Sequence, residues 1–106
     1  DAGTRRTLAE KAWAADARYV DPVSDVTGAG GFAGMVAGIQ EHYAGHSVVR
    51  TSAIDQHHDQ IRFEWELRAA DGAVVVAGVD YGELAPDGRL QSITGFFGPV
   101  AQEEAA

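Results

Sequence analysis

Two aspartates stand in sequence surroundings that could support acid–base chemistry. Asp80 interrupts residues 73–84, a run of valine, alanine and glycine that is the most strand-like stretch of the chain. Because burying an isolated charge is costly, a carboxylate there must be paired, protonated or used. Asp21 stands directly before Pro22. We expect Asp80 to lie deeper, with a raised pKa, and Asp21 to be partly solvated and ionised, an arrangement that separates an acid from a base.

Simpler interpretations of the same residues remain open. Asp80 could pair with a neighbouring arginine or lie near an exposed strand end, and Asp21 could be an ordinary turn acid before proline. Tyr19 shares the face of Asp21 if the segment is extended, as a following proline favours. Its phenol could then donate to a substrate oxygen, or it could close the mouth of the core as an aromatic plug.

The elements expected to position these residues are helices first and strands afterwards. Asp1 is suited to cap a first helix that includes Leu8, Ala12 and Trp13 and ends around Asp16. Residues 28–31 are expected to be a loop, and residues 32–43 a second helix. Strands are expected at 47–57, 61–69, 73–84 and 90–97, with tight turns at 71–72 and 86–88. This order predicts one α+β domain over residues 1–106, with helices covering one face of a curved, mostly antiparallel sheet.

The alternation of side chains along these strands defines an inner face. In residues 61–68 apolar and charged residues alternate, so that the apolar ones face the helices. Aromatic walls with glycines between them are typical of a cup for a flat apolar ligand. The glycines could instead be bulges or bends that curl the sheet. The residues expected to line the ligand site are Trp13, Phe63, Trp65, Val76, Gly78, Ile93, Gly95 and Phe97.

The outer face of the third strand is apolar as well. Val75, Ala77, Val79 and Tyr81 alternate with the inward residues, and Phe96 of the last strand should lie beside them. An apolar sheet face needs a cover. We therefore predict a homodimer packed sheet against sheet through these five residues.

Composition limits the partners and the chemistry. The 106 residues include 8 basic and 16 acidic side chains, a net charge of −8, which disfavours nucleic acid and membranes as partners. The absence of cysteine excludes thiol chemistry and fits a reducing cytoplasm. His57 and His58 fall at a hairpin and should point to opposite faces, as a solvated turn and not as metal ligands. We expect no metal and no other cofactor.

Several motifs occur in a characteristic order. Tyr19-Val20-Asp21-Pro22 follows a helix, Gly28 precedes the second helix, and Val79-Asp80 and Asp87-Gly88-Arg89-Leu90 precede Phe96-Phe97-Gly98. Together they resemble the nuclear transport factor 2-like superfamily, and within it SnoaL-like polyketide cyclases and ketosteroid isomerases. The resemblance implies a cone-shaped, cystatin-like α+β barrel with a pocket between sheet and helices, and commonly a homodimer.

The resemblance also implies roles for two residues. Asp21 matches the general base of ketosteroid isomerases. Asp80 matches their protonated, oxyanion-binding aspartate and also the strand aspartate of the SnoaL-like cyclases. The first helix of the family, which carries the isomerase's oxyanion tyrosine, is expected to be missing from this chain.

Two functions are therefore considered. The first is a cofactor-free cyclase or isomerase acting on a flat, apolar carbonyl compound. The second is a non-catalytic ligand-binding or dimerisation module of the same fold. A third interpretation is a collapsed pocket in which Trp65 and Phe97 simply fill the core.

Overall fold

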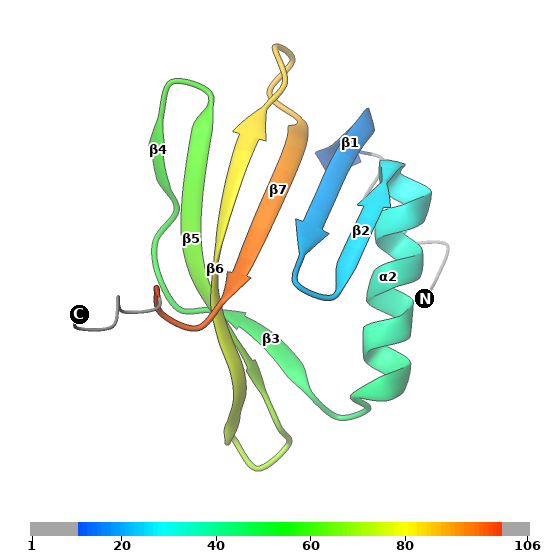
Figure 1. Cartoon of the computed structure of the whole chain (residues 1–106), viewed down its shortest axis with the longest axis vertical. Coiled ribbons are helices and arrows are strands. Elements are labelled where there is room, and N and C mark those ends of the chain that lie inside the picture. Colours follow the sequence, from blue (N-terminus) through cyan, green and yellow to red (C-terminus); the bar gives the residue numbers. More distant parts are fainter. Residues whose placement is uncertain (1–10, 101–106) are drawn as a thin grey trace, which may run out of the picture.

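The computed structural model describes residues 11–100, so that the predicted cap Asp1 and Leu8 lie outside the described residues. The elements of this part of the chain are one long helix and seven strands, and Figure 1 shows how they are arranged. In chain order they are β1 (Trp13–Asp21), β2 (Ser24–Thr27), α2 (Gly28–His42), β3 (Ser47–Arg50), β4 (Asp55–His57), β5 (Gln60–Arg68), β6 (Val74–Leu84) and β7 (Leu90–Phe97).

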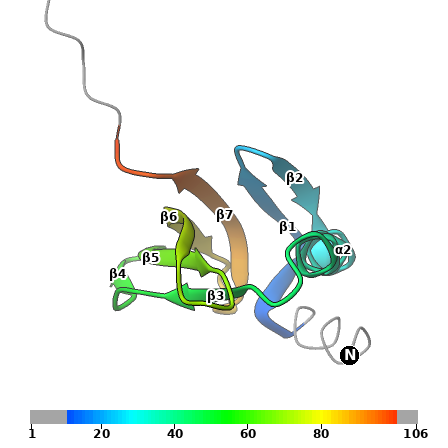
Figure 2. The ribbon, with the colours of Figure 1, turned by 90° about the horizontal axis from the view of Figure 1, so that it is seen from below.

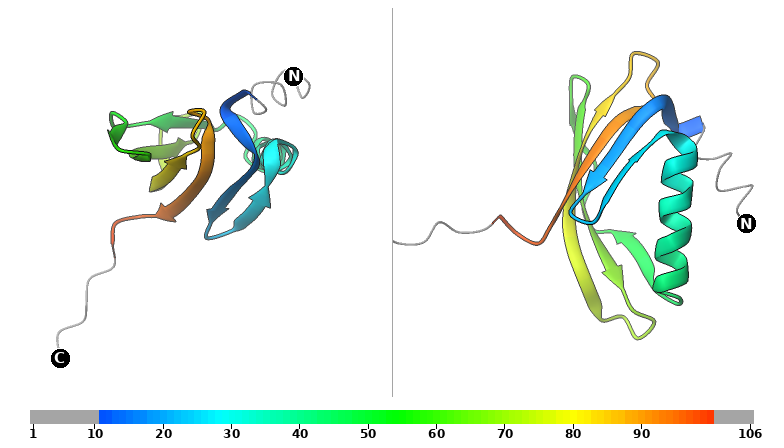
Figure 3. Two further views of the ribbon diagram at one scale, coloured as in Figure 1. Left: turned by 90° about the horizontal axis from the view of Figure 1, so that it is seen from above. Right: turned by 45° about the vertical axis from the view of Figure 1, so that its right-hand side comes forward.

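The strands form one curved, mixed sheet. Their order is β2-β1-β7-β6-β5-β3, with β4 paired to β5, and the pairing of β1 with β7 is parallel whereas the other pairings are antiparallel. The right-hand view of Figure 3 shows the concave side of the sheet turned toward α2. Figure 2 shows α2 beside the β1–β2 hairpin at one end, with β3, β4 and β5 at the other. The α+β class with a curved sheet is thereby confirmed.

The register of β5, β6 and β7 confirms the predicted inner face. Phe63 is opposite Asp80, and Asp80 is opposite Gly95. Trp65 is opposite Gly78, which is in turn opposite Phe97. Directly opposed residues of neighbouring antiparallel strands point to the same side of the sheet. The predicted ligand-facing residues of these three strands therefore share one face with Asp80.

The core lies where β1, β7 and α2 meet. Trp13, Ala14, Ala17 and Ile93 are buried there, and Phe32 from α2 packs against them. The rings of Trp13 and Phe32 are 4.5 Å apart between centroids. This contact fixes α2 against the inner side of the sheet, next to the chain segment that carries Tyr19 and Asp21.

Residues 11 and 12 are helical as predicted, but the prediction that this helix ends around Asp16 is wrong, because strand β1 begins at Trp13. The alanine-rich sequence favours a helix, but pairing with β7 and burial of Trp13 against Phe32 override that local preference. The short strand β2, which follows the turn at Pro22 and Val23 and pairs with β1, is absent from the prediction.

Two other boundaries also differ. Residues 28–31 are the first turn of α2 and not a loop; Gly28 has a φ of 78°, which lets the chain turn sharply from β2 into the helix. Residues 47–57 form two strands, β3 and β4, with a break at 51–54. The last three strands agree with the prediction to within a residue.

The described part of the chain contains no helix that combines the length and the apolar character of a membrane span.

Candidate active site

Asp80 is a buried carboxyl group on the concave face of the sheet. It is 8% exposed and is the one charged residue that is buried within residues 11–100. The indole N–H of Trp65 donates a hydrogen bond of 2.8 Å to its Oδ1 atom. Burial raises the pKa of Asp80; the Trp65 hydrogen bond opposes this rise and the nearby charge of Asp21 adds to it. The pKa of Asp80 is therefore raised, which is the direction predicted from the sequence.

Tyr19 and Asp21 form a second polar pair at the end of β1. The Tyr19 hydroxyl donates to Asp21 Oδ2 at 2.7 Å, and the backbone N–H of Val23 donates to Asp21 Oδ1 at 2.9 Å. Burial, the hydrogen bond to Asp21 and the negative charges of Asp80 and Asp21 raise the pKa of Tyr19. The phenol consequently stays protonated at neutral pH and remains a hydrogen-bond donor.

Gly95 on β7 is the point where the two acids approach each other. A Cβ atom at this position would stand 2.7 Å from Asp80 Oδ1 and 3.3 Å from Asp21 Cβ. The first distance is shorter than Cβ contacts in folded proteins, so a side chain here would displace the carboxyl group. The missing side chain thus lets Asp21 and Asp80 approach each other, with Tyr19 bonded to Asp21. That these three residues form a catalytic site stays a prediction.

Two aromatic side chains, Trp65 and Phe97, lie on one side of Asp80. The Trp65 indole lies against the backbone of Gly78, where a Cβ atom would overlap its ring. Trp65 and Phe97 meet edge to face, with centroids 5.9 Å apart and planes at 82°. The role of Trp65 as a hydrogen-bond donor to Asp80 was missed in the sequence, where the residue reads only as an apolar wall.

Other residues predicted to line the ligand site lie in the core. Trp13 is 6% exposed and Ile93 is 4% exposed, and both belong to the buried cluster under α2. Val76 is half-buried on the same face as Asp80. Contact of any of these residues with a ligand stays a prediction.

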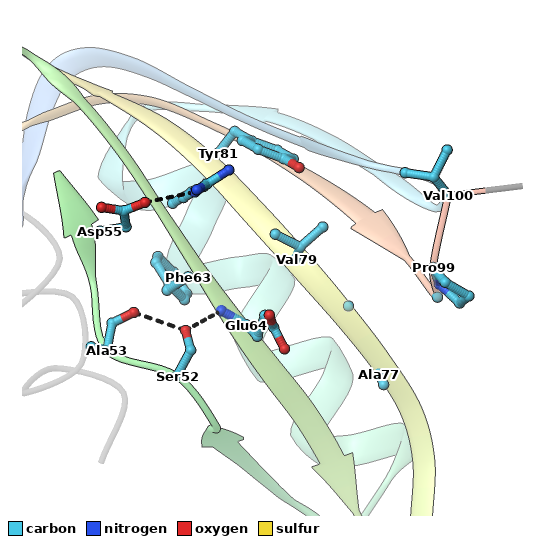
Figure 4. Close-up of a pocket in the computed structure, with 13 residues that line it drawn as sticks. Ser52, Ala53, Asp55, Phe63, Glu64, Ala77, Val79, Tyr81, Pro99 and Val100 are labelled. Atoms are coloured by element: carbon cyan, nitrogen blue, oxygen red, sulfur yellow. Dashed lines mark hydrogen bonds and ion pairs between the residues drawn. The ribbon is translucent and has the colours of Figure 1, made fainter. Parts of the chain in front are cut away.

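A shallow hollow of about 760 Å³ lies mainly on the opposite, outer face of the sheet. Figure 4 shows Ala77, Val79 and Tyr81 along β6 at its floor. Its margin includes the ion pair between Arg62 and Asp55. Neither Asp21 nor Asp80 lines this hollow. An enclosed cup around Asp80 therefore stays a prediction.

The prediction that His57 and His58 point apart is wrong. Their Nδ1 atoms are 3.1 Å apart, because His58 adopts a left-handed backbone with φ 51° at the hairpin, where strand alternation ends. Within residues 11–100, no group of three or more histidine, cysteine or acidic side chains could hold a metal ion.

Solved structures resemble this chain along most of its length. A candidate isomerase of the SnoaL-like family from Agrobacterium tumefaciens str. C58 has a TM-score of 0.88 and 34% identity, over 93% of this chain and 85% of that one. A candidate SnoaL-like polyketide cyclase from Jannaschia sp. CCS1 has a TM-score of 0.70 and 18% identity, over 87% of this chain and 71% of that one.

A third structure, from Catenulispora acidiphila DSM 44928, has a ketosteroid isomerase-like fold and was solved in complex with trimethylamine. Its TM-score is 0.69 at 18% identity, over 89% of this chain and 75% of that one. No family model and no curated protein matches the sequence.

The curved sheet and its covering helix are the fold of NTF2-like, cystatin-like proteins. Further structures that match this chain are described as NTF2-like or as having a cystatin-like fold. The similarity to the Agrobacterium protein identifies the family within this class, because 34% identity over 93% of the chain is a similarity of sequence as well as of fold. The chain belongs to the SnoaL-like family.

Proposed function

We propose that the chain is a small-molecule enzyme of the isomerase or cyclase type, in which Asp80 transfers a proton at carbon. The substrate would be a flat, largely apolar carbonyl compound lying against Trp65 and Phe97. The observation that supports this best is a buried carboxyl group, held at one oxygen by Trp65 and close to a phenol and a second acid. The cytoplasm is the proposed compartment, because a chain without cysteine fits a reducing environment.

The proposed reaction begins with proton abstraction. Ionised Asp80 removes a proton from the carbon next to the carbonyl, and the electron pair of the broken C–H bond moves onto the carbonyl oxygen. The Tyr19 phenol, which burial keeps protonated, turns its one O–H from Asp21 to the oxygen of the resulting enolate and donates a hydrogen bond to it. Asp80 then returns the proton to another carbon. In a cyclase, the enolate carbon instead attacks a second carbonyl, whose oxygen receives the proton.

The hydrogen-bond partners favour Asp80 over Asp21 as the group that moves the proton. Both oxygens of Asp21 accept protein hydrogen bonds, from Tyr19 and Val23. Asp80 accepts one such bond among the described residues, at Oδ1 from Trp65. Its raised pKa also brings its titration closer to neutral pH, where a general base is most effective.

Proton exchange at carbon tests this proposal without knowledge of the natural substrate. The protein is mixed with α-tetralone, a flat bicyclic ketone, in deuterated buffer, and loss of the proton next to the carbonyl is followed by NMR. The wild-type protein should accelerate the exchange, and Asp80→Asn should lower the acceleration by a factor of about a hundred or more. The matched control Asp25→Asn, on an exposed strand position, should keep it.

Full activity in the Asp80→Asn variant would contradict the mechanism. Binding of the ketone with no exchange in any variant would instead support the alternative function, a non-catalytic ligand-binding module of the same fold.

We also propose that the outer face of the sheet packs against a second copy of the chain. Val75, Tyr81 and Phe96 are 47%, 43% and 54% exposed there, a large apolar surface for a single molecule. The arginines around it are already paired, as Arg18–Asp25, Arg62–Asp55 and Arg68–Glu66. Because each of these arginines has its acidic partner within the same copy, the contact between two copies would rest on the apolar side chains of this face.

A further inference from the structure

Arg50 places a positive charge on the edge of the face that carries Asp80. The register of β3 sets Arg50 directly opposite Trp65 on β5, and directly opposed residues of an antiparallel pair point to the same side of the sheet. Trp65 is in turn bonded to Asp80 on β6. Arg50, Trp65 and Asp80 therefore follow one another across three neighbouring strands on the concave side.

Arg50 differs from the other described arginines in lacking an acidic partner. No ion pair or hydrogen bond joins its side chain to another side chain within residues 11–100, although the chain has 16 acidic residues against 8 basic ones. The remaining arginines of this part of the chain all form ion pairs, namely Arg18–Asp25, Arg62–Asp55, Arg68–Glu66 and Arg89–Asp87.

A guanidinium without a carboxylate partner can bind one that a ligand supplies. Its planar fork of N–H groups matches a carboxylate in a bidentate geometry, and such charged hydrogen bonds are among the stronger ones in proteins. Asp21 and Asp80 would repel the same carboxylate at the other end of the site. The charges across the face would thus hold an acidic ligand in one orientation.

We propose that Arg50 binds a carboxylate group of the substrate, which is then an aromatic or polycyclic carbonyl acid and not a neutral ketone. This inference rests on the proposed function of the same face. Neighbouring strands are spaced by 4.7–4.9 Å, so β3 and β6 lie roughly 10 Å apart across β5. A bicyclic ketone with a carboxylate at its far end suits this span: the acid at Arg50, the ring against Trp65 and the reacting carbon at Asp80.

The test compares two probes that differ only by one carboxylate group. One is α-tetralone; the other is α-tetralone with a carboxylate on its aromatic ring, on the side away from the carbonyl. Their affinities are measured by calorimetry at neutral pH and low salt. The wild-type protein should bind the acid about tenfold more tightly than the ketone. Arg50→Ala should abolish this preference and Arg50→Lys should keep part of it, while the outer-face control Arg68→Ala should keep it fully.

Equal affinities for the two probes in the wild-type protein, or no measurable binding of the acid, would overturn the inference. So would a preference for the acid that survives in Arg50→Ala. The same titrations in an Asp80→Asn background separate the two proposals. The charge preference should persist in that background, because Arg50 and not Asp80 binds the carboxylate. A wild-type protein that shows this preference but does not exchange the proton next to the carbonyl would refute the catalytic role of Asp80 and leave the role of Arg50 standing.

Discussion

At the scale of single residues, the site consists of two acids with different surroundings. Asp80 receives the Trp65 N–H in a buried position, whereas Asp21 receives two donors at the partly buried end of β1. Both aspartates and Tyr19 could be found from the sequence, because an acid in an apolar strand and an acid before proline are local patterns. The hydrogen bond between Trp65 and Asp80 could not be predicted from the sequence. It joins residues on neighbouring strands that are not directly opposite each other, and the length of the indole decides whether it forms.

The raised pKa of Asp80 predicts a pH-dependent stability. The folded protein holds the Asp80 proton more tightly than the unfolded chain does, so this contribution is fully present below the ordinary aspartate pKa of about 4 and is lost as the pH rises through the folded pKa. Asp80→Asn keeps an oxygen acceptor for Trp65 but cannot ionise. Its free energy of unfolding in urea should exceed that of the wild type at neutral pH, by about 1.4 kcal/mol for each unit of raised pKa.

This gain should vanish in acid, where wild-type Asp80 is itself protonated. Asp25→Asn is the control with the opposite expected sign, because Arg18 lowers the pKa of that exposed aspartate and the variant loses a weak ion pair. An Asp80→Asn protein that is less stable than the wild type at every pH would contradict the account.

At the scale of elements, tertiary pairing decides what local sequence does not. The three last strands could be predicted because alternation and turn glycines are local signals, and Gly72 and Gly88 indeed have positive φ values of 88° and 87°. Strand β1 could not, because its alanine-rich sequence favours a helix and its partner β7 lies far along the chain. The glycine-rich start of α2 favours a loop by its local sequence, but packing against β1 and β2 holds it in a helix.

Glycine substitutions test how β7 positions the acids. In Gly95→Ala the new Cβ would stand 2.7 Å from Asp80 Oδ1, so the variant should lose about 1–3 kcal/mol of stability and its Asp80 carboxyl group should move. In the control Gly38→Ala, within α2, a Cβ would meet nothing within 4 Å, and the variant should gain about 1 kcal/mol. Urea unfolding measures both, and a Gly95→Ala protein as stable as the wild type would show that the acids are not held at β7.

At the scale of the whole molecule, the sheet has an apolar surface on each side. The concave side faces α2, and the outer side carries the exposed rings of Tyr81 and Phe96, whose centroids are 6.1 Å apart. The sequence predicts this two-sided apolarity through simple alternation along β6. The sequence does not predict the hollow beside Tyr81, because residues 98–100 and the break between β3 and β4 help to line it.

The proposed dimer predicts a mass of two chains in solution. Light scattering at micromolar concentration should give twice the chain mass of 11.2 kDa. Tyr81→Glu and Phe96→Glu should each shift the protein to a monomer, because a buried unpaired charge at the interface is costly. Val23→Glu, at an exposed position outside the face, should leave the mass unchanged. A monomeric wild-type protein would contradict the proposal.

The central claim is that Asp80 is a buried acid whose protonation the site controls. Carboxyl-carbon NMR, with the Asp80 signal assigned through the Asp80→Asn variant, measures its titration directly. We expect a midpoint well above the ordinary value of about 4, and a further rise in Trp65→Phe, which loses the N–H donor that favours the ionised form, but not in the control Trp13→Phe. A midpoint at the ordinary value, unchanged in Trp65→Phe, would contradict the claim.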